Sequence, residues 1–154
     1  MPPRWLTGLR KAAALPAPQR GDLARALAAL AGAQLALWTR PRGRLVQAGT
    51  AAASAAWTAA QAERAADLAR AVDRAAMAFP ATCLVRALAL HRLLGAEGLA
   101  GARIRLGVRP EGEGLHAHAW VEFAGAVLGD DGGRAHAFAP FGAGALPMDA
   151  RREA

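Results

Sequence analysis

The spacing of the apolar residues changes once along this chain, close to Pro80, and this change limits the possible folds more than any other feature. Between residues 22 and 79 apolar side chains recur at helical intervals. After Pro80, in residues 103–108 and 115–123, successive side chains alternate in character between two faces, as they do in strands. A short helical run, residues 82–94, stands between the two patterns. We therefore expect an α+β fold, with N-terminal helices followed by one helix packed on a small antiparallel sheet.

The length of 154 residues suits one domain, because two cores of ordinary size need more chain. We expect residues 1–20 to form a loosely ordered basic arm, interrupted by prolines, and residues 22–79 to form the helical part. Residues 80–141 are expected to form a core that carries the chemistry, and residues 142–154 a tail.

Within the helical part, Asp22 is the expected N-cap of a first helix, which Pro41 and Gly43 end. The clearest part of a second helix is Ala62 to Phe79, with charged residues on the side away from its apolar stripe. We interpret both helices mainly as packing elements.

A third helix is expected to open at Thr82 and Cys83 and to end at Gly95. An acidic, glycine-bearing loop (110–114) and a tight turn at residues 124–125 separate strands. The expected strands are Arg103–Val108, Leu115–Phe123, Ala126–Leu128 and Ala135–Phe138.

The formal net charge is +7, and 18 of the 19 basic residues are arginines, since Lys11 is the only lysine (19 − 1 = 18). Such a charge favours anionic partners. The arginines are scattered, however, and no run of them matches a nucleic-acid-binding motif, so we expect no nucleic-acid partner.

No targeting signal or integral membrane segment is expected, because the uncharged stretches are rich in alanine and small polar residues. One cysteine excludes an internal disulfide and fits a reducing compartment, so we expect a cytoplasmic protein. No metal-ligand spacing and no phosphate-binding loop are present, so we expect neither a metal nor another cofactor.

A lone cysteine such as Cys83 is by default a small buried apolar residue. Here it falls in the first turn of its expected helix, where the helix dipole favours a thiolate. Histidines follow on a strand, and an aspartate lies on or just past the next strand. These are the three parts of a nucleophile, a base and a group that orients the base. The strand also presents four polar or aromatic residues on one face, His116, His118, Trp120 and Glu122.

Two strings make the interpretation more specific: residues 82–90 read TCLVRALAL, and residues 116–122 read HAHAWVE before a turn at Gly125. From about Ala71 to Phe141 the chain resembles the transglutaminase-like cysteine proteases, and among them the leader peptidases of lasso peptide biosynthesis. The resemblance implies a papain-like core whose Cys-His-Asp triad cleaves the leader from a ribosomally made precursor peptide. A separate ATP-dependent cyclase then joins the new N-terminal amine to an acidic side chain.

Carried over by motif, Cys83 is the nucleophile, His118 the base and Asp130 the orienting acid. The last assignment uses the spacing of 12 residues (130 − 118 = 12), which suits a turn and a return strand, and Asp131 is the alternative.

His116, Trp120 and Glu122 are candidates for lining the cleft, Trp120 as a packed wall and Glu122 as the partner of an arginine. His91 and His136 have no motif support, and we interpret both as structural or surface residues. The backbone N–H of Cys83 is expected in the oxyanion hole, with a second donor left unassigned.

The expected function is that of a cysteine endopeptidase acting on a lasso precursor. Members of this family often carry an N-terminal leader-recognition domain with a three-stranded sheet, but no alternating pattern precedes Ile104. We therefore expect a separate recognition protein to deliver the peptide, docking on the helices between Asp22 and Phe79. Two alternatives stay open: acyl transfer to an amine, as in true transglutaminases, and a non-catalytic peptide-binding module.

Overall fold

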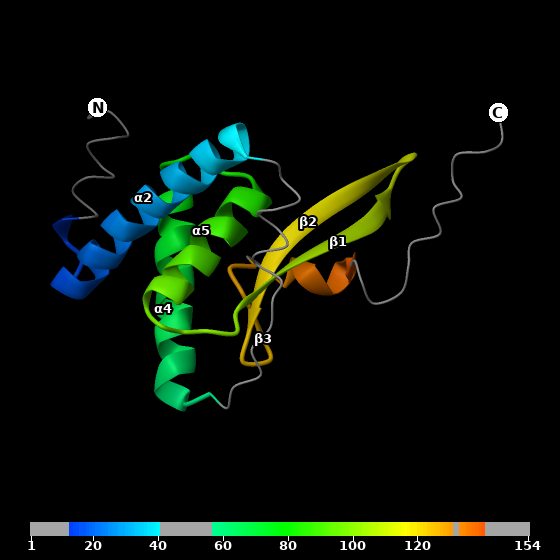
Figure 1. Cartoon of the computed structure of the whole chain (residues 1–154). Coiled ribbons are helices and arrows are strands. Elements are labelled where there is room, and N and C mark those ends of the chain that lie inside the picture. Colours follow the sequence, from blue (N-terminus) through cyan, green and yellow to red (C-terminus); the bar gives the residue numbers. More distant parts are fainter. Residues whose placement is uncertain (1–12, 41–56, 131–132, 141–154) are drawn as a thin grey trace.

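The computed structural model describes residues 13–40, 57–130 and 133–140. Three helices come first, and they are α2 (Ala17–Thr39), α4 (Ala59–Ala76) and α5 (Cys83–Ala96). After them come β1 (Arg103–Glu111), β2 (Gly114–Phe123), β3 (Ala126–Leu128), the 3₁₀ helix η1 (Arg134–Ala137) and β4 (Ala139–Pro140). This order confirms the expected α+β fold (Figure 1). The expected tail and most of the expected arm lie outside the described residues.

The first helix begins six residues earlier than predicted, at Ala17, with Pro16 instead of Asp22 at the N-cap position. Asp22 therefore lies inside α2, where it is 8% exposed. Its carboxylate accepts two hydrogen bonds from the guanidinium of Arg64 in α4 (Nη1–Oδ2 2.5 Å, Nη2–Oδ1 2.8 Å). The prediction that Asp22 caps the helix is wrong, because its side chain joins two helices instead of bonding its own backbone.

The other two helices are capped by side chains that the sequence supplies directly before them. Thr58 and Gln61 form a capping box at the start of α4. Thr82 caps α5, where its Oγ1 accepts the N–H of Val85 at 3.4 Å. Cys83 is thus the first residue of α5, as the sequence predicted.

All strand pairs are antiparallel, in the order β3-β2-β1-β4. A two-residue turn at Gly112 and Glu113 joins β1 to β2, so the hairpin continues to Glu111 and Gly114 where a longer loop was expected. The predicted tight turn at Ala124 and Gly125 is present, with φ of 53° and 78°.

The predicted fourth strand, Ala135–Phe138, is wrong. Residues 134–137 form η1 instead, which begins after the left-handed Gly133 (φ 69°). Only residues 139–140 pair as a strand, with Gly107 and Val108 of β1.

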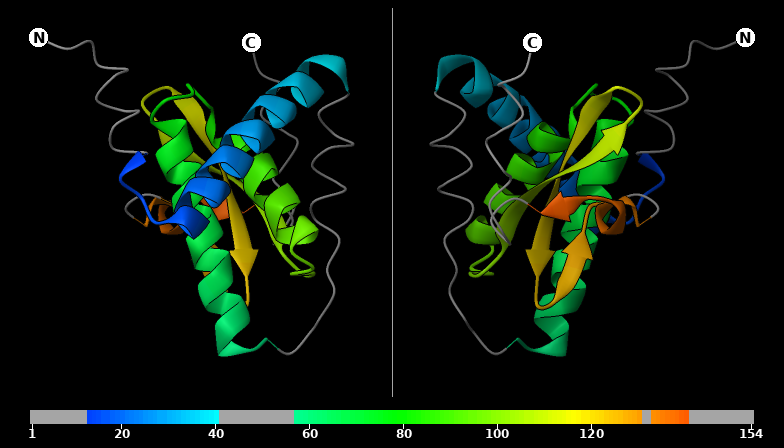
Figure 2. Two further views of the ribbon diagram at one scale, coloured as in Figure 1. Left: turned by 90° about the vertical axis from the view of Figure 1, so that its left-hand side faces the viewer. Right: turned by 90° about the vertical axis from the view of Figure 1, so that its right-hand side faces the viewer.

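The helices cover one face of the sheet, and η1 lies on the side of the other face (Figure 2). On the helix side, Ile104, Val121 and Phe123 pack with buried residues of all three helices. On the opposite side, Trp120 packs with Ala135 and Phe138 in a smaller apolar cluster. In the part of the chain that the structure describes, no helix combines the length and apolar content needed to cross a bilayer.

Candidate active site

The single cysteine occupies the N-terminal end of α5. Its thiol is free and half-buried, packed against the edge of the main core. At this end of a helix the first backbone N–H groups have no intrahelical acceptor, and the helix dipole favours negative charge. Thr82 uses one of these groups, that of Val85, and leaves those of Cys83 and Leu84 available to a substrate.

The packing of α5 on β2 brings this end of the helix toward the histidine strand (Figure 1). Ala87 of α5 lines a small hollow together with Ala119 and Trp120 of β2. Cys83 lies one helical turn before Ala87 and shares its face of the helix. His118 directly precedes Ala119 on β2, so its side chain lies on the opposite face of the strand, with that of Trp120. Among the described residues, no hydrogen bond joins the thiol of Cys83 to the imidazole of His118.

His118 and Asp130 form a partly buried pair. The Nε2 atom of His118 lies 3.2 Å from Oδ1 of Asp130, and the two side chains are 14% and 3% exposed. The other carboxylate oxygen, Oδ2, accepts the backbone N–H of Ala135 at 2.6 Å. A carboxylate only accepts, so Nε2 carries the proton and donates it to Asp130. The Nδ1 atom of His118 is left to act as a base.

Two aromatic rings hold the imidazole of His118. Trp120 is stacked on it, with centroids 5.9 Å apart, and Phe138 lies at 5.0 Å. Gly107, the β1 partner of His118, has no side chain to separate these rings. A Cβ at this position would come within 2.8 Å of Trp120 and 2.9 Å of Phe138, so the close approach requires glycine.

Glu122 forms a hydrogen bond with Trp120. Its carboxylate accepts the indole N–H of Trp120 at 3.3 Å and the Nε–H of Arg105 at 2.8 Å. The expected ion pair between Glu122 and an arginine is therefore present. Of the three cleft-lining candidates, Trp120 is the one that lines the hollow between α5 and β2.

His116 lies on the same face as His118 but nearer the tip of the hairpin, with its side chain 49% exposed. Its Nδ1 contacts the carboxylate of Glu111, and this hydrogen bond lowers the pKa of Glu111. Its ring also meets the edge of Phe138 at 5.6 Å. His116 is thus engaged outside the His118–Asp130 pair.

The remaining histidines lie elsewhere. His91 is on α5, where burial lowers its pKa despite a hydrogen bond with the backbone of Ala102. His136 is exposed on η1. Asp131, the alternative to Asp130, lies outside the described residues.

Sequence reasoning missed two groups that fix the pair, the N–H of Ala135 and the ring of Phe138. Phe138 was placed in a fourth strand, and no pattern in the sequence links it to His118. Gly107 carried a weak signal, since a glycine inside an alternating strand often marks a close approach of other groups.

The structure thus has a half-buried thiol at the N-terminus of a helix, and that helix packs on the strand that carries His118, the hydrogen-bonded partner of Asp130. Such an α+β domain is compatible with cysteine peptidase or acyltransferase chemistry. The family model of the transglutaminase-like superfamily matches residues 26–142, which is more than half of the chain. The chain therefore belongs to the transglutaminase-like superfamily. Neither the search of curated proteins nor the search of solved structures found a match.

Proposed function

We propose that this protein is a cysteine endopeptidase that removes the leader from a lasso-type precursor peptide, together with a separate leader-recognition protein and an ATP-dependent cyclase. The supporting observation is the His118–Asp130 pair, whose histidine lies on the strand that packs against the helix carrying Cys83. The strings TCLVRALAL and HAHAWVE add the resemblance to leader peptidases.

In the proposed reaction, Nδ1 of His118 takes the proton of the Cys83 thiol, and the thiolate attacks the scissile carbonyl carbon. The tetrahedral intermediate collapses when the imidazolium of His118 gives its proton to the leaving amine, which is the N-terminus of the core peptide. The leader remains as a thioester on Cys83. Water, deprotonated by His118, then attacks this thioester and releases the leader as a carboxylic acid and the free thiol.

Asp130 has an orienting role in this proposal. Its carboxylate keeps the proton of neutral His118 on Nε2 and stabilises the imidazolium that forms during the reaction. The backbone N–H groups of Cys83 and Leu84 are the candidate donors to the oxyanion, because they point out of the first turn of α5.

The same thioester can react with an amine instead of water, which would make the protein an acyltransferase. The two reactions differ in their products, since hydrolysis yields a free carboxylic acid and aminolysis yields an amide. A non-catalytic peptide-binding module would yield neither.

The test is the cleavage of a precursor peptide, followed by mass spectrometry, with the wild-type protein and with Cys83→Ala. We expect separate leader and core peptides from the wild type and none from Cys83→Ala, because only a thiol offers this reactivity. The variant should retain the wild-type circular dichroism spectrum, since the substitution removes one half-buried atom.

Cleavage by purified Cys83→Ala would contradict the mechanism. A crosslinked or amidated product from the wild type would favour the acyltransferase. Peptide binding without either product, and a thiol that iodoacetamide does not alkylate, would favour the binding module.

A further inference from the structure

The outer face of α2 has the composition of a buried surface. Between residues 24 and 38 all exposed residues of α2 are apolar, and they are Ala24, Leu27, Ala28, Ala31, Leu35 and Trp38, here called the α2 stripe. Leu27, Leu35 and Trp38 are 38%, 57% and 75% exposed. The opposite face of α2, with Leu30, is buried against α4 and α5. A helix that is apolar on both faces is normally covered on both, so a partner is expected on the stripe.

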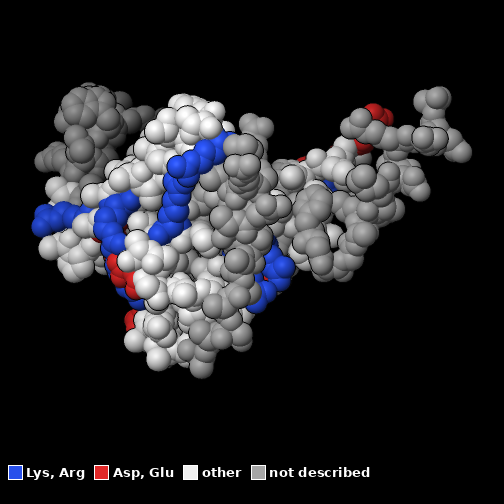
Figure 3. All heavy atoms as spheres, in the orientation of Figure 1, with Lys and Arg blue, Asp and Glu red and all other residues white. Residues whose placement is uncertain are grey.

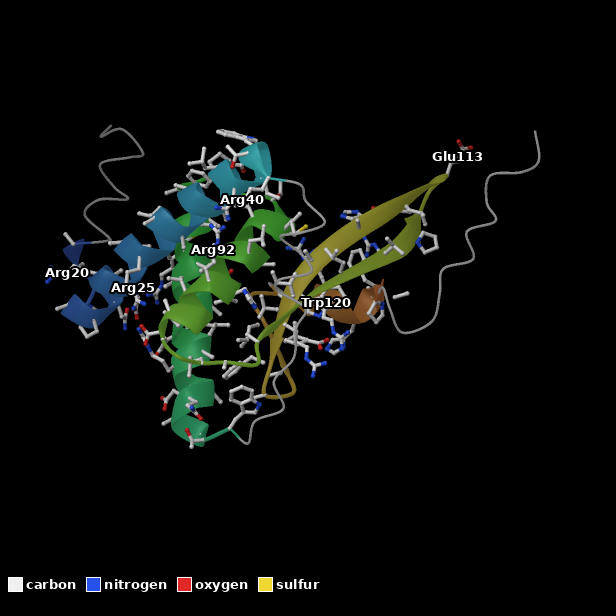
Figure 4. The ribbon with its side chains drawn as sticks, in the orientation of Figure 1. Arg20, Arg25, Arg40, Arg92, Glu113 and Trp120 are labelled. Atoms are coloured by element: carbon white, nitrogen blue, oxygen red, sulfur yellow. The ribbon has the colours of Figure 1, made fainter. Side chains whose placement is uncertain are left out.

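Arginines border the stripe. Arg20, Arg25, Arg92 and Arg40 follow α2 from its beginning to its end (Figure 4). The guanidinium of Arg92 reaches α2 from α5, beside Gly32. The space-filling view, in the same orientation, shows Lys and Arg atoms along this part of the surface (Figure 3). Arg25 pairs with Glu97 at 2.5 Å, whereas Arg20, Arg40 and Arg92 are exposed residues.

This border argues against a second copy of the chain as the occupant. Two such stripes facing each other would bring like charges together, on molecules that each carry a formal +7. The complementary surface is an apolar patch bordered by aspartate and glutamate. The stripe spans about 21 Å, which is the length of about four helical turns and suits a helix or a flat patch of a folded protein.

We propose that the α2 stripe is the docking site for an acidic protein partner, with Leu35 and Trp38 as its apolar anchors and Arg20, Arg40 and Arg92 as its charged border. The assignment of this partner as the leader-recognition protein rests on the proposed function. Because α2 packs on α4 and α5 while His118 lies on β2, a partner held there leaves the candidate active site open to the peptide. A docked partner that holds the precursor would raise the effective concentration of the peptide at the candidate active site to about millimolar, although the partner does not contact the scissile bond.

The test titrates purified recognition protein into the full chain in a calorimeter and compares the wild type with Leu35→Ser/Trp38→Ser. We expect the double variant to bind at least about tenfold more weakly, because exposed aromatic anchors dominate such interfaces. The matched control is Met77→Ser, which replaces another exposed apolar side chain, 83% exposed, at the end of α4. It should bind like the wild type.

Two further readouts separate docking from catalysis. Precursor cleavage should be slow without the partner and rise by orders of magnitude with it, and the double variant should keep the slow rate and lose the rise. Arg92→Glu should slow association and weaken its dependence on salt, because it reverses one charge of the border.

Binding that is unchanged in the double variant, or equally weakened in Met77→Ser, would overturn the proposal. Two other outcomes would also overturn it: self-association of the wild type in sedimentation, or binding of the wild type to anionic lipid vesicles, if Leu35→Ser/Trp38→Ser abolishes that behaviour. If the wild type binds the partner through the stripe but never cleaves precursor, the docking proposal stands and the peptidase proposal fails. If cleavage rises with the partner equally in all variants, the reverse holds.

Discussion

At the scale of single residues, the side chain of His118 is fixed by one hydrogen bond and two ring contacts. One ring nitrogen is hydrogen-bonded to Asp130, and the ring meets the aromatic side chains of Trp120 and Phe138. His116, two residues away, has a contact with Glu111 at the exposed tip of the hairpin. The two histidines therefore differ in fixation and burial although they share a face of β2.

This difference predicts unequal effects of removing each ring. His118→Ala should reduce precursor cleavage by roughly 10²–10⁴-fold, which is typical for a positioned acid–base group. His116→Ala should reduce it by about tenfold or less, because its side chain is not part of the His118–Asp130 pair. Initial rates of cleavage measure both effects. Equal or reversed effects would show that His116 is the base.

Asp130→Asn is expected to impair cleavage severely while leaving the fold intact. The amide is nearly isosteric, and its oxygen can still accept one of the two hydrogen bonds, but it no longer stabilises the imidazolium of His118. The pH dependence of cleavage should change as well, because the variant alters the charge beside His118. Asp131→Asn is the matched control, with nearly wild-type rates expected. If both variants were fully active, the orienting group would lie elsewhere.

At the scale of elements, four charged side chains fix the three helices relative to one another. Arg64 of α4 bonds Asp22 of α2 and also Glu97 at the end of α5, with Nε–Oε2 at 3.0 Å. Arg25 of α2 reaches Glu97 as well. The hydrogen bond from Arg64 is the main cause that lowers the pKa of Asp22, and the bonds from Arg64 and Arg25 lower the pKa of Glu97 to about 2.

Removal of the shared guanidinium should therefore destabilise the helical part. Arg64→Ala is expected to lower the free energy of unfolding by about 2 kcal/mol, a value reduced for the partial exposure of Arg64, because Asp22 loses its main partner while largely buried. Urea unfolding measures the change. The control is Arg70→Ala, whose partner Asp67 lies on the same helix with both side chains about half exposed, and about 0.5 kcal/mol or less is expected there.

The same network gives the sign of a pH dependence. Folding lowers the pKa of Glu97 from 4.5 to about 2, so the folded protein binds fewer protons than the unfolded chain as the pH falls through this range. The stability that Glu97 contributes is complete above its unfolded pKa and is lost toward pH 2. The difference between wild type and Arg64→Ala should accordingly shrink between about pH 7 and about pH 3. A difference that grows on acidification would contradict this account.

At the scale of the whole molecule, the proposed functions lie on separate layers. Cys83 begins α5 and His118 lies on β2, which packs on α5, whereas the α2 stripe lies on the outer face of α2, away from α5. The charge network lies between the three helices and keeps α2 in place against α5. The fold thereby separates the surface that would hold a delivering partner from the strand that would meet the peptide.

The sequence by itself determined the elements and the superfamily. The change of apolar period predicted helices before strands, Thr82 marked the start of α5, and the strings around Cys83 and His118 pointed to the superfamily that the family match confirms. These features are local, since caps, turns and alternation depend on residues only a few positions apart. The roles of Cys83, His118 and Asp130 stay predictions.

Only the tertiary structure decided what each side chain contacts. Asp22 is of a residue type that often caps helices, but its carboxylate instead accepts hydrogen bonds from Arg64, which lies 42 residues further along the chain. The alternation of residues 135–138 suggested a strand. In the structure, the backbone N–H of Ala135 donates to Asp130, residues 134–137 form a 3₁₀ helix, and Phe138 lies against the ring of His118. Such pairings are set by how helices and sheet pack in space, and a one-dimensional pattern records which faces are apolar but not which surfaces meet.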